Sequence, residues 1–254
     1  MDVASWLRNL GLEVWDSLHP ALRLAHMLRR SGALRSILFG HWANVLTRGR
    51  LAESLHWVTQ IHEAAEAYRD QDLRILTHYT AQVSYFLLGE LIKAREHGDQ
   101  LLANYTEERV GHVVDVIHQD PKTVALCYNA HLTWMLGYPE QAMKTSDATD
   151  AHARRRGHPF DLGFWLTIGA LIFDYLGDPE RLLKRTEEAA RLGRENSLPV
   201  LTRVLVPVHS GIALIRQGLR WGNSVAGGRP RCFGGGRVVD ARCFPVGSRL
   251  LPMA

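Results

Sequence analysis

The 254-residue chain holds 30 lysines and arginines against 26 aspartates and glutamates, a formal net charge of +4. Residues 219–254 contain six of the arginines and one of the acids, which leaves 24 basic and 25 acidic residues in the rest of the chain. A body so close to neutral disfavours nucleic acid as a partner. Three cysteines without short paired spacing disfavour a disulfide framework and a zinc site.

Residues 1–12 are predicted to form a short amphipathic helix that ends near Gly11. This stretch resembles the start of a sterile-alpha-motif (SAM) domain. So short a segment cannot bury a core of its own, and the alternative is a first helix that leans on those that follow. The chain has no signal peptide at its start and no run of the roughly 20 apolar residues that span a bilayer. We therefore expect a soluble, cytoplasmic protein with no membrane partner.

Residues 13–218 carry repeated turns. Glycines recur there at spacings of 40, 48, 40 and 41 residues, mostly where an amphipathic stretch ends: Gly49, Gly89, Gly137, Gly177 and Gly218. In the stretch 133–142, an apolar stripe of helical spacing stops at Gly137, and Pro139 stands where a second helix would begin. This pattern predicts helical hairpins, the first two at 33–47 with 51–69 and at 75–88 with 91–105. The alternative is chance spacing of glycines. In the second hairpin, the apolar spacing predicts a buried face and the charges predict a solvated one: Ile75, Tyr79, Val83, Phe86 and Leu87 on the former, Glu90, Lys93, Glu96 and Asp99 on the latter.

The hairpins resemble the tetratricopeptide repeat (TPR) family, whose first helix ends in a glycine turn and whose second helix carries a small residue at the helix contact. Five positions after the glycine, the residue here is small or apolar: Ser54, Ala94, Ala142 and Leu182. The period is longer than the usual value of roughly 34 residues. The sequence predicts an all-α fold, a TPR-like αα-hairpin solenoid of about four hairpins with a disordered C-terminal tail. The predicted segments are 1–12, 13–218 and 219–254.

Residues 106–121 account for the longest of these spacings. Gly111, several β-branched residues and the Asp120-Pro121 step predict a long connection, closed by Asp120 as the cap of the next helix. Long connections in compact repeats often line a binding face. His112, Asp115 and His118 allow a metal-binding alternative, but surface residues of this kind far outnumber true ligands.

A more specific resemblance rests on five stretches: 18–22, 118–123, 136–139, 150–163 and 192–199. They are similar to the carboxy-terminal TPR-like region of large bacterial multidomain proteins described as adenylate cyclases. The similarity covers residues 14–218. In that family a SAM-like segment, a class III nucleotide cyclase domain and a P-loop ATPase domain precede the repeats, and this chain joins the start directly to the repeats. The resemblance therefore implies the regulatory region of a nucleotide-signalling protein.

The motifs of nucleotide chemistry are not found in the sequence. A class III cyclase needs two metal-binding acids on a β-rich domain, and the chain has no long β-rich segment. Gly234–Gly236 lacks the lysine and hydroxyl residue of a phosphate-binding loop, and His62-Glu63 lacks the second histidine of a zincin motif. We therefore expect no enzymatic activity, no catalytic residue, no cofactor site and no metal site.

Arg154, Arg155 and Arg156 end a predicted helix just before Gly157. Cations at a helix carboxyl end are favourable, and the alternative is a contact with an anion or a nucleic acid. Aromatic residues at several helical positions are expected to pack in the core rather than to stack on a ligand: Trp42, Trp57, Trp134, Phe164, Trp165, Phe173 and Tyr175.

The composition changes after Gly218. Residues 219–254 contain seven glycines and six arginines, which oppose a helix where the second helix of a hairpin should follow. Translation out of an ancestral reading frame is the favoured explanation, and a native basic tail is the alternative. Without that second helix, we expect an apolar stripe on the preceding helix to be partly exposed and open to self-association: Val204, Leu205, Val208, Ile212, Leu214 and Ile215.

The sequence therefore predicts a non-catalytic helical-repeat module whose concave face binds a protein partner or senses a small ligand. One alternative is cyclic AMP synthesis by descent from the parent family. A second is a solenoid that binds nucleic acid through its arginine clusters.

Overall fold

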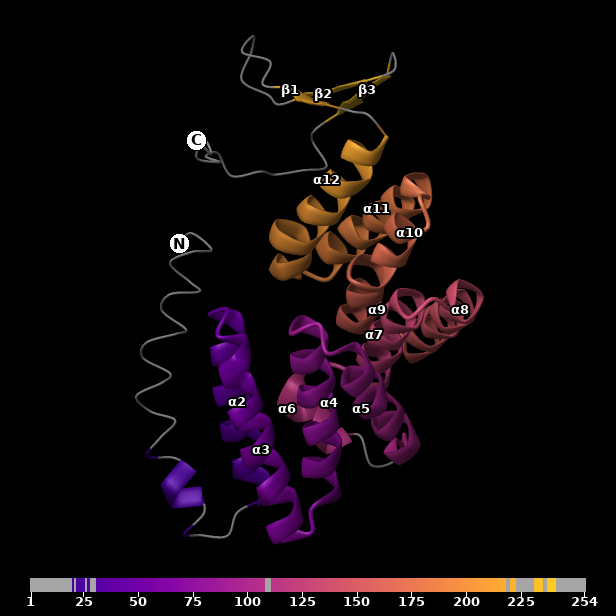
Figure 1. Ribbon diagram of the computed structural model, residues 1–254. Helices are drawn as coiled ribbons and strands as arrows, with labels where there is room; N and C mark the ends of the chain where they lie inside the picture. The colour runs from indigo at the N-terminus through magenta and orange to yellow at the C-terminus, as the bar shows by residue number, and fades with distance from the viewer. Residues whose placement is uncertain are drawn as a thin grey trace. The chain divides into compact units, whose positions relative to one another are not determined.

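The computed structural model describes residues 20, 22–25, 27, 31–107, 111–217, 220–222, 231–234 and 237–240. Up to residue 217, the regular structure of the described chain is helical, as the sequence predicted (Figure 1). The chain divides into two compact units, residues 1–145 and residues 146–254. The predicted segment 1–12, with its resemblance to a SAM domain, and the predicted boundary after residue 218 lie outside the described residues.

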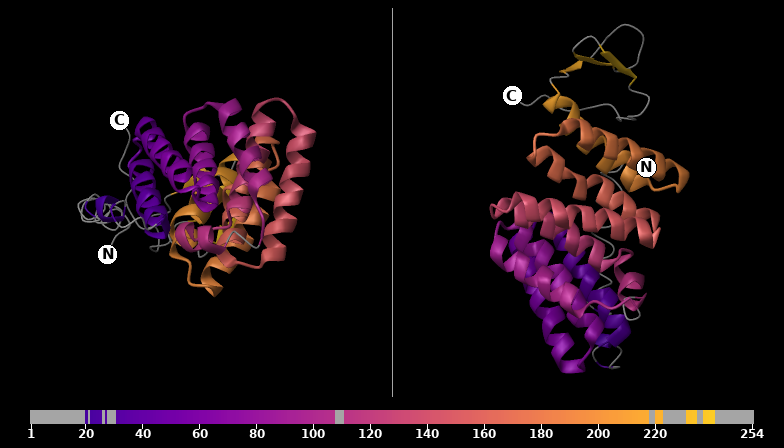
Figure 2. Two further views of the ribbon diagram at one scale, coloured as in Figure 1. Left: turned by 90° about the horizontal axis from the view of Figure 1, so that it is seen from below. Right: turned by 90° about the vertical axis from the view of Figure 1, so that its right-hand side faces the viewer.

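Unit 1 is a series of helices joined by short turns. They are α2 (Ser31–Thr47), α3 (Leu51–Tyr68), α4 (Gln71–Leu87), α5 (Leu91–Asn104), α6 (Gly111–Ile117), α7 (Pro121–Met135) and the first part of α8 (Pro139–Arg156). Neighbours in this series lie side by side, α2 on α3, α3 on α4, α4 on α5 and α5 on α7 (Figures 1 and 2). The two predicted hairpins are confirmed, with bounds that agree to within a few residues.

The hairpin turns share one backbone geometry. At Gly137, φ is +93°, the Gly137 N–H donates to Trp134 O at 2.9 Å, and the Tyr138 N–H donates to Thr133 O at 3.0 Å. This pair of bonds is the Schellman motif, which satisfies carbonyls that a helix end leaves open. Gly49, Gly89 and Gly177 have the same pair of bonds and positive φ. The predicted glycine turns at these four positions are confirmed.

Two further turns make the same bonds without glycine. Arg69 (φ 51°) ends α3 and Ser197 (φ 52°) follows α11. A side chain in the left-handed region is strained, so the chain carries strain at these two turns. Because the residues are not glycines, the spacing pattern in the sequence did not include them.

Helix α4 is the centre of unit 1 and packs against α2, α3, α5, α6 and α7. Of its predicted buried residues, Ile75, Tyr79 and Val83 are buried, Phe86 is half-buried and Leu87 is exposed. Met135 and Leu136, which end the stripe predicted on α7, are also exposed. These three residues stand at hairpin bends, where the chain leaves the packed part of its partner helix. The periodic stripes were therefore predicted one or two residues too long.

The connection 106–121 differs from the sequence prediction, because residues Gly111–Ile117 form the helix α6. α6 packs against α2 and α4. Helix propensity is a weak preference that packing overrides, and Val113 and Ile117 are buried in this position. The predicted cap is confirmed: Asp120 Oδ2 accepts hydrogen bonds from the Thr123 N–H at 2.9 Å and the Thr123 hydroxyl at 2.8 Å.

Unit 2 continues from the second part of α8. Its elements are α9 (Pro159–Thr167), the 3-10 turn η1 (Gly169–Leu171), α10 (Ile172–Tyr175), α11 (Pro179–Glu195), the π-helical turn η2 (Leu201–Leu205) and α12 (Val206–Arg216). Helix α11 packs on α9 and α12. Leu201 is fully buried and approaches Gly163 and Gly193 so closely that a Cβ on either glycine would overlap a neighbouring side chain. Glycine at both positions allows this contact.

The stripe predicted on the last helix is exposed in part. Val204 is 37% exposed, Val208 55% and Ile215 70%, whereas Leu214 is buried and Leu205 and Ile212 are half-buried. Leu214 turns inward because α12 packs against α11. The exposed residues therefore occupy the side of η2 and α12 that faces away from the core of unit 2.

Beyond α12, the structure describes eleven residues of the segment predicted as a disordered tail. Three short strands, β1 (Arg220–Gly222), β2 (Arg231–Gly234) and β3 (Arg237–Asp240), form an antiparallel sheet in the order β1-β2-β3. The register pairs Trp221 with Cys232 and Cys232 with Val239. The glycines that oppose a helix here do not prevent a short ladder, and valines 238 and 239 favour strands.

Candidate interaction surface

An aromatic cluster joins α2 to α4. The ring of Tyr79 on α4 meets the rings of Phe39 and Trp42 on α2 edge to face, with centroids 6.2 and 5.9 Å apart. The indole N–H of Trp42 donates to the Ser84 hydroxyl at 2.9 Å. Edge-to-face pairs and a bonded indole fix the rings in place. The side of α2 and α4 that α6 packs against, called the α2–α4 face, therefore belongs to a rigid pair of helices.

The segment after α6 is tied to the same cluster. The Tyr79 hydroxyl donates to Oε1 of Gln119 at 3.0 Å. His118, directly before it, has φ of 55°, and its N–H donates to Val114 O at 2.7 Å. The chain thus leaves α6 through a left-handed residue and is held against α4 before α7 begins.

Asp120 joins both ends of the connection that contains α6. Besides capping α7, its Oδ1 accepts a hydrogen bond from the Tyr105 hydroxyl at 2.9 Å. Lys122 Nζ lies 5.1 Å from the centre of the Tyr105 ring, a cation–π distance. Tyr105 directly follows α5, and Asp120 directly precedes α7, so this cluster closes the base of the connection.

A polar network, buried at Gln82 and Asn129 and exposed at Asp99, connects α4, α5 and α7. The Gln82 amide donates to Asn129 Oδ1 at 2.9 Å, and the Asn129 amide donates to Asp99 Oδ1 at 2.9 Å. Arg95 pairs with Asp99 at 2.9 Å and donates to the Thr133 hydroxyl at 2.5 Å. The sequence placed Glu90, Lys93, Glu96 and Asp99 on a solvated surface. All four residues are exposed as predicted, and Asp99 also accepts a hydrogen bond from the buried Asn129 of the next hairpin, a contact that charge spacing on one helix cannot reveal.

Two histidines face each other across the α4–α5 hairpin. The Nδ1 atoms of His78 and His97 are 3.0 Å apart, and the ring of Tyr85 stacks on His97 at 5.5 Å. One imidazole must donate and the other accept, so the pair is compatible with at most one shared proton between the two Nδ1 atoms. Burial, with the nearby His97 and His62, lowers the pKa of His78 to about 4. Burial is also the main cause that lowers the pKa of His97.

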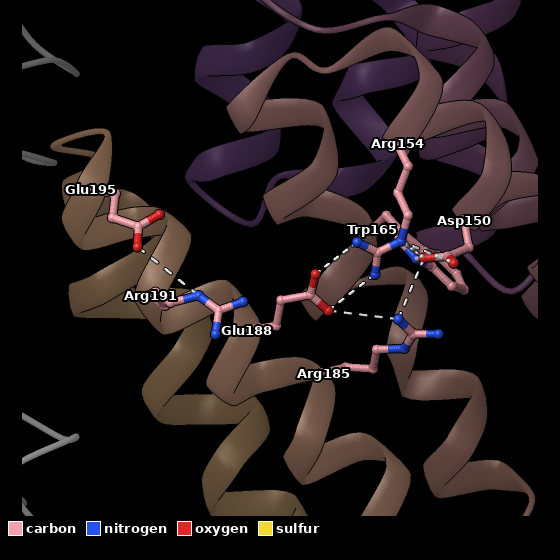
Figure 3. A network of polar contacts seen from close by, with 7 residues as sticks. All are labelled: Asp150, Arg154, Trp165, Arg185, Glu188, Arg191 and Glu195. Carbon is pink, nitrogen blue, oxygen red and sulfur yellow. Dashed lines mark hydrogen bonds and ion pairs between the residues drawn. The ribbon is translucent and has the colours of Figure 1, made fainter.

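In unit 2, the predicted arginine cluster is engaged with carboxylates (Figure 3). Arg154 Nε lies 3.0 Å from Asp150 Oδ1, and its Nη1 and Nη2 lie 2.7 and 3.0 Å from the two carboxylate oxygens of Glu188 on α11. Such bidentate pairs are the stronger kind of ion pair. The hydrogen bond from Arg154 lowers the pKa of Glu188 and raises that of Arg154.

Further contacts extend this network. The Trp165 indole N–H donates to Asp150 Oδ1 at 2.6 Å, and Arg185 Nη1 lies 3.5 Å from Asp150 and 3.6 Å from Glu188. Arg155 lies 3.0 Å from His152 Nδ1, and Arg156 lies 3.9 Å from the buried carboxylate of Asp161. The arginine cluster thus holds α8 against α9 and α11, which favours a structural role over the predicted alternative of an anion contact.

The aromatic residues mostly pack as predicted. Trp42, Trp57, Trp165 and Phe173 are buried, and Trp134, Phe164 and Tyr175 are half-buried. Arg181 lies over the Phe173 ring at 4.9 Å, and Trp57 stacks on His41 at 4.0 Å. These rings therefore belong to the packing inside the two units.

Within the described residues, no group of three or more histidine, cysteine, aspartate or glutamate side chains is arranged to hold a metal ion. His112 and Asp115 are exposed on α6, and His118 is exposed just after it. In the same part of the chain, no helix is both long and apolar enough to cross a membrane. Comparison with known protein families and with curated proteins finds no match to this chain.

Proposed function

We propose that the hairpins of this chain form a TPR-like solenoid that acts as a non-catalytic module for binding a protein or sensing a small ligand. The observation that supports this proposal most directly is the packing in unit 1. There α4 packs against α2 and α7, the first helices of the neighbouring hairpins, as well as against its own partner α5. First helices packed in a row present one extended face, which is how helical repeats bind partners.

The resemblance in residues 14–218 suggests where such a module works. We propose that it belongs to the regulatory region of a nucleotide-signalling protein of the adenylate cyclase type. The alternative is cyclic AMP synthesis by the chain itself, and incubation of the purified chain with ATP and Mg²⁺ separates the two. Cyclic AMP formed in that assay would favour the alternative.

The interaction function is tested by selecting peptides from a random library on the immobilised full chain. A binding module should enrich a family of related sequences, and hydrogen exchange should show that the selected peptide protects amides of α2 and α4. Selection that enriches no common sequence would contradict the proposal. Glutamate substitution of the two conserved apolar positions of the selected peptide is the control.

We also propose that the exposed residues of η2 and α12 pair two copies of the chain. Val204, Val208 and Ile215 are exposed apolar residues in a single stretch, and such patches promote association. Analytical ultracentrifugation should show a concentration-dependent dimer that Val208→Lys weakens. Lys184→Glu is the control. Lys184 is exposed and has no apolar contact to lose, so this variant should dimerise as the parent does. A parent chain that stays monomeric at about 100 μM, a concentration at which even weak pairing is visible, would contradict this proposal.

A further inference from the structure

Helix α6 covers the α2–α4 face with two aliphatic side chains. Val113 and Ile117 stand four residues apart and therefore share one side of the helix. Both are buried, whereas His112 and Asp115 are exposed. α6 packs against α2 and α4, and Figure 1 shows it between them. The α2–α4 face is thus a surface that accepts two aliphatic side chains one helical turn apart.

α6 depends on this docking for its helical form. It has seven residues, far fewer than the roughly 12 to 15 that an isolated helix needs to be even marginally stable in water. Its sequence is rich in β-branched residues, which lower helix propensity. A short segment with two buried side chains, anchored after its end by the hydrogen bond from Tyr79 to Gln119, belongs to the part of a protein that opens locally, without global unfolding.

The base of the connection allows such opening. The Tyr105 hydroxyl and Asp120 Oδ1 are 2.9 Å apart, and they join the end of α5 to the start of α7. Asp120 also caps α7 through Thr123. These contacts lie outside α6, so release of Val113 and Ile117 leaves the packing of α5 on α7 in place.

We propose that the α2–α4 face is a docking surface for an amphipathic helix of a partner protein, and that α6 occupies this surface until the partner displaces it. This proposal rests on the proposed interaction function and specifies its partner. The partner helix presents two aliphatic residues four positions apart, as α6 does, and binds through its apolar side. α6 lowers the apparent affinity for the partner, because only the fraction of molecules with α6 released can bind.

The test uses α6 itself as the probe. A fluorescent peptide of residues 111–119, stapled between positions 112 and 116 on its outer side, is titrated against the full chain and followed by anisotropy. The double variant Val113→Asp with Ile117→Asp releases the tethered α6. We expect this variant to bind the peptide at least about tenfold more tightly than the parent chain, because in the parent chain the tethered α6 competes with the peptide at a high effective concentration. His112→Asp adds one negative charge on the exposed side of α6 and should bind as the parent does.

Equal affinity for the parent and the double variant, or no binding by a double variant of unchanged helical content, would overturn the proposal. If the double aspartate variant loses helical content, the double variant Val113→Ala with Ile117→Ala replaces it. We expect this variant to bind the peptide more tightly than the parent chain, by a smaller factor. An unchanged affinity would contradict the proposal. Tyr105→Phe weakens unit 1 without uncovering the α2–α4 face and should not increase binding. Because the peptide comes from the chain itself, this result is independent of whether the library selection finds a foreign partner.

Discussion

The hydroxyl of Tyr105 donates a hydrogen bond to Oδ1 of Asp120 at 2.9 Å and so joins α5 to α7 across a connection of fourteen residues. Asp120 is fully buried, and its other oxygen caps α7. Tyr105→Phe removes the donor and leaves Oδ1 of a buried carboxylate with one bond fewer. A buried acceptor that loses its partner costs about 1–3 kcal/mol.

We therefore expect Tyr105→Phe to lower the free energy of unfolding by that amount in urea. Tyr138→Phe is the matched control, since the Tyr138 side chain is exposed in the turn between α7 and α8, and its stability should stay within about 0.5 kcal/mol of the parent. Equal stability of the two variants would show that the Tyr105 bond does not hold the base of the connection.

A substitution at Gly137 tests the geometry of the hairpin turns. Space around the missing side chain of this glycine is open, since no heavy atom lies within 4 Å of a Cβ built there, but φ is +93°. Gly137→Val should therefore destabilise through backbone strain alone, by more than the roughly 1 kcal/mol that separates glycine from good helix formers. A thermal melt unchanged by this substitution would contradict the turn assignment.

The reverse substitution at another turn is the companion experiment. Arg69 has φ of 51° in a turn with the same pair of hydrogen bonds. Arg69→Gly should relieve strain and raise the melting temperature. Because glycine also gains freedom in the unfolded chain, we expect the free energy of unfolding to rise by no more than about 1 kcal/mol. A lower melting temperature would show that Arg69 is not strained.

The ion pair between Glu188 and Arg154 predicts that the stability of unit 2 depends on pH. The pKa of Glu188 is lowered by the hydrogen bond from Arg154, so the folded state holds its proton less tightly than the unfolded state. The resulting stability is present above the unfolded pKa of about 4.3 and is lost as pH falls through the folded value. Glu188→Gln should cost about 0.2–1 kcal/mol at pH 7, given that the pair is partly exposed, and the cost should shrink below pH 4.

Urea unfolding at pH 7 and pH 3.5 measures both values. Glu187→Gln changes the neighbouring exposed carboxylate and should cost less at pH 7. A Glu188→Gln cost that is the same at both pH values would contradict the assigned ion pair.

The histidine pair predicts a second pH dependence. The lowered pKa of His78, about 4, means that the unfolded state binds a proton more readily between that value and 6.5. Stability from this residue is therefore complete above pH 6.5 and declines as pH falls toward 4. His97, His62, Glu96 and Tyr85 are the groups near the pair.

NMR titration of the His78 imidazole measures its pKa directly, with a midpoint near 4 expected. His78→Gln should make the melting temperature less dependent on pH between 4 and 6.5. A midpoint at 6.5 or above would show that the ring is solvated and that the pair is not formed in solution.

The sequence revealed features that depend on local chemistry. Gly49, Gly89, Gly137 and Gly177 mark their turns because few other residues adopt positive φ readily. Asp120 was predicted as a cap because a carboxylate before a proline-initiated helix is a local pattern. Arg69 and Ser197 make similar turns without such a residue, so nothing in the sequence pointed to them.

Features that join distant segments were missed. Two such contacts, the hydrogen bond from Gln82 to Asn129 and the contact between His78 and His97, depend on which helix faces pack together. Helix periodicity predicts which face of a helix is buried, but not which other helix covers that face. α6 was missed for a related reason, since its glycine and β-branched residues disfavour a helix in isolation. Its packing on α2 and α4, with Val113 and Ile117 buried, stabilises it there.

Amide hydrogen exchange of the unmodified full chain tests the central claim most directly, because it measures whether α6 opens while the α2–α4 face stays folded. The account predicts that amides of residues 115–117, which follow the four amides that a helix start leaves without an intrahelical acceptor, exchange at least about 100-fold faster than those in the interior of α4 and α7, as expected for local opening. It also predicts that Val113→Ala increases exchange in α6 alone. Exchange of α6 at the same rate as α4 and α7 would contradict the account, since α6 would then be a permanent part of the core.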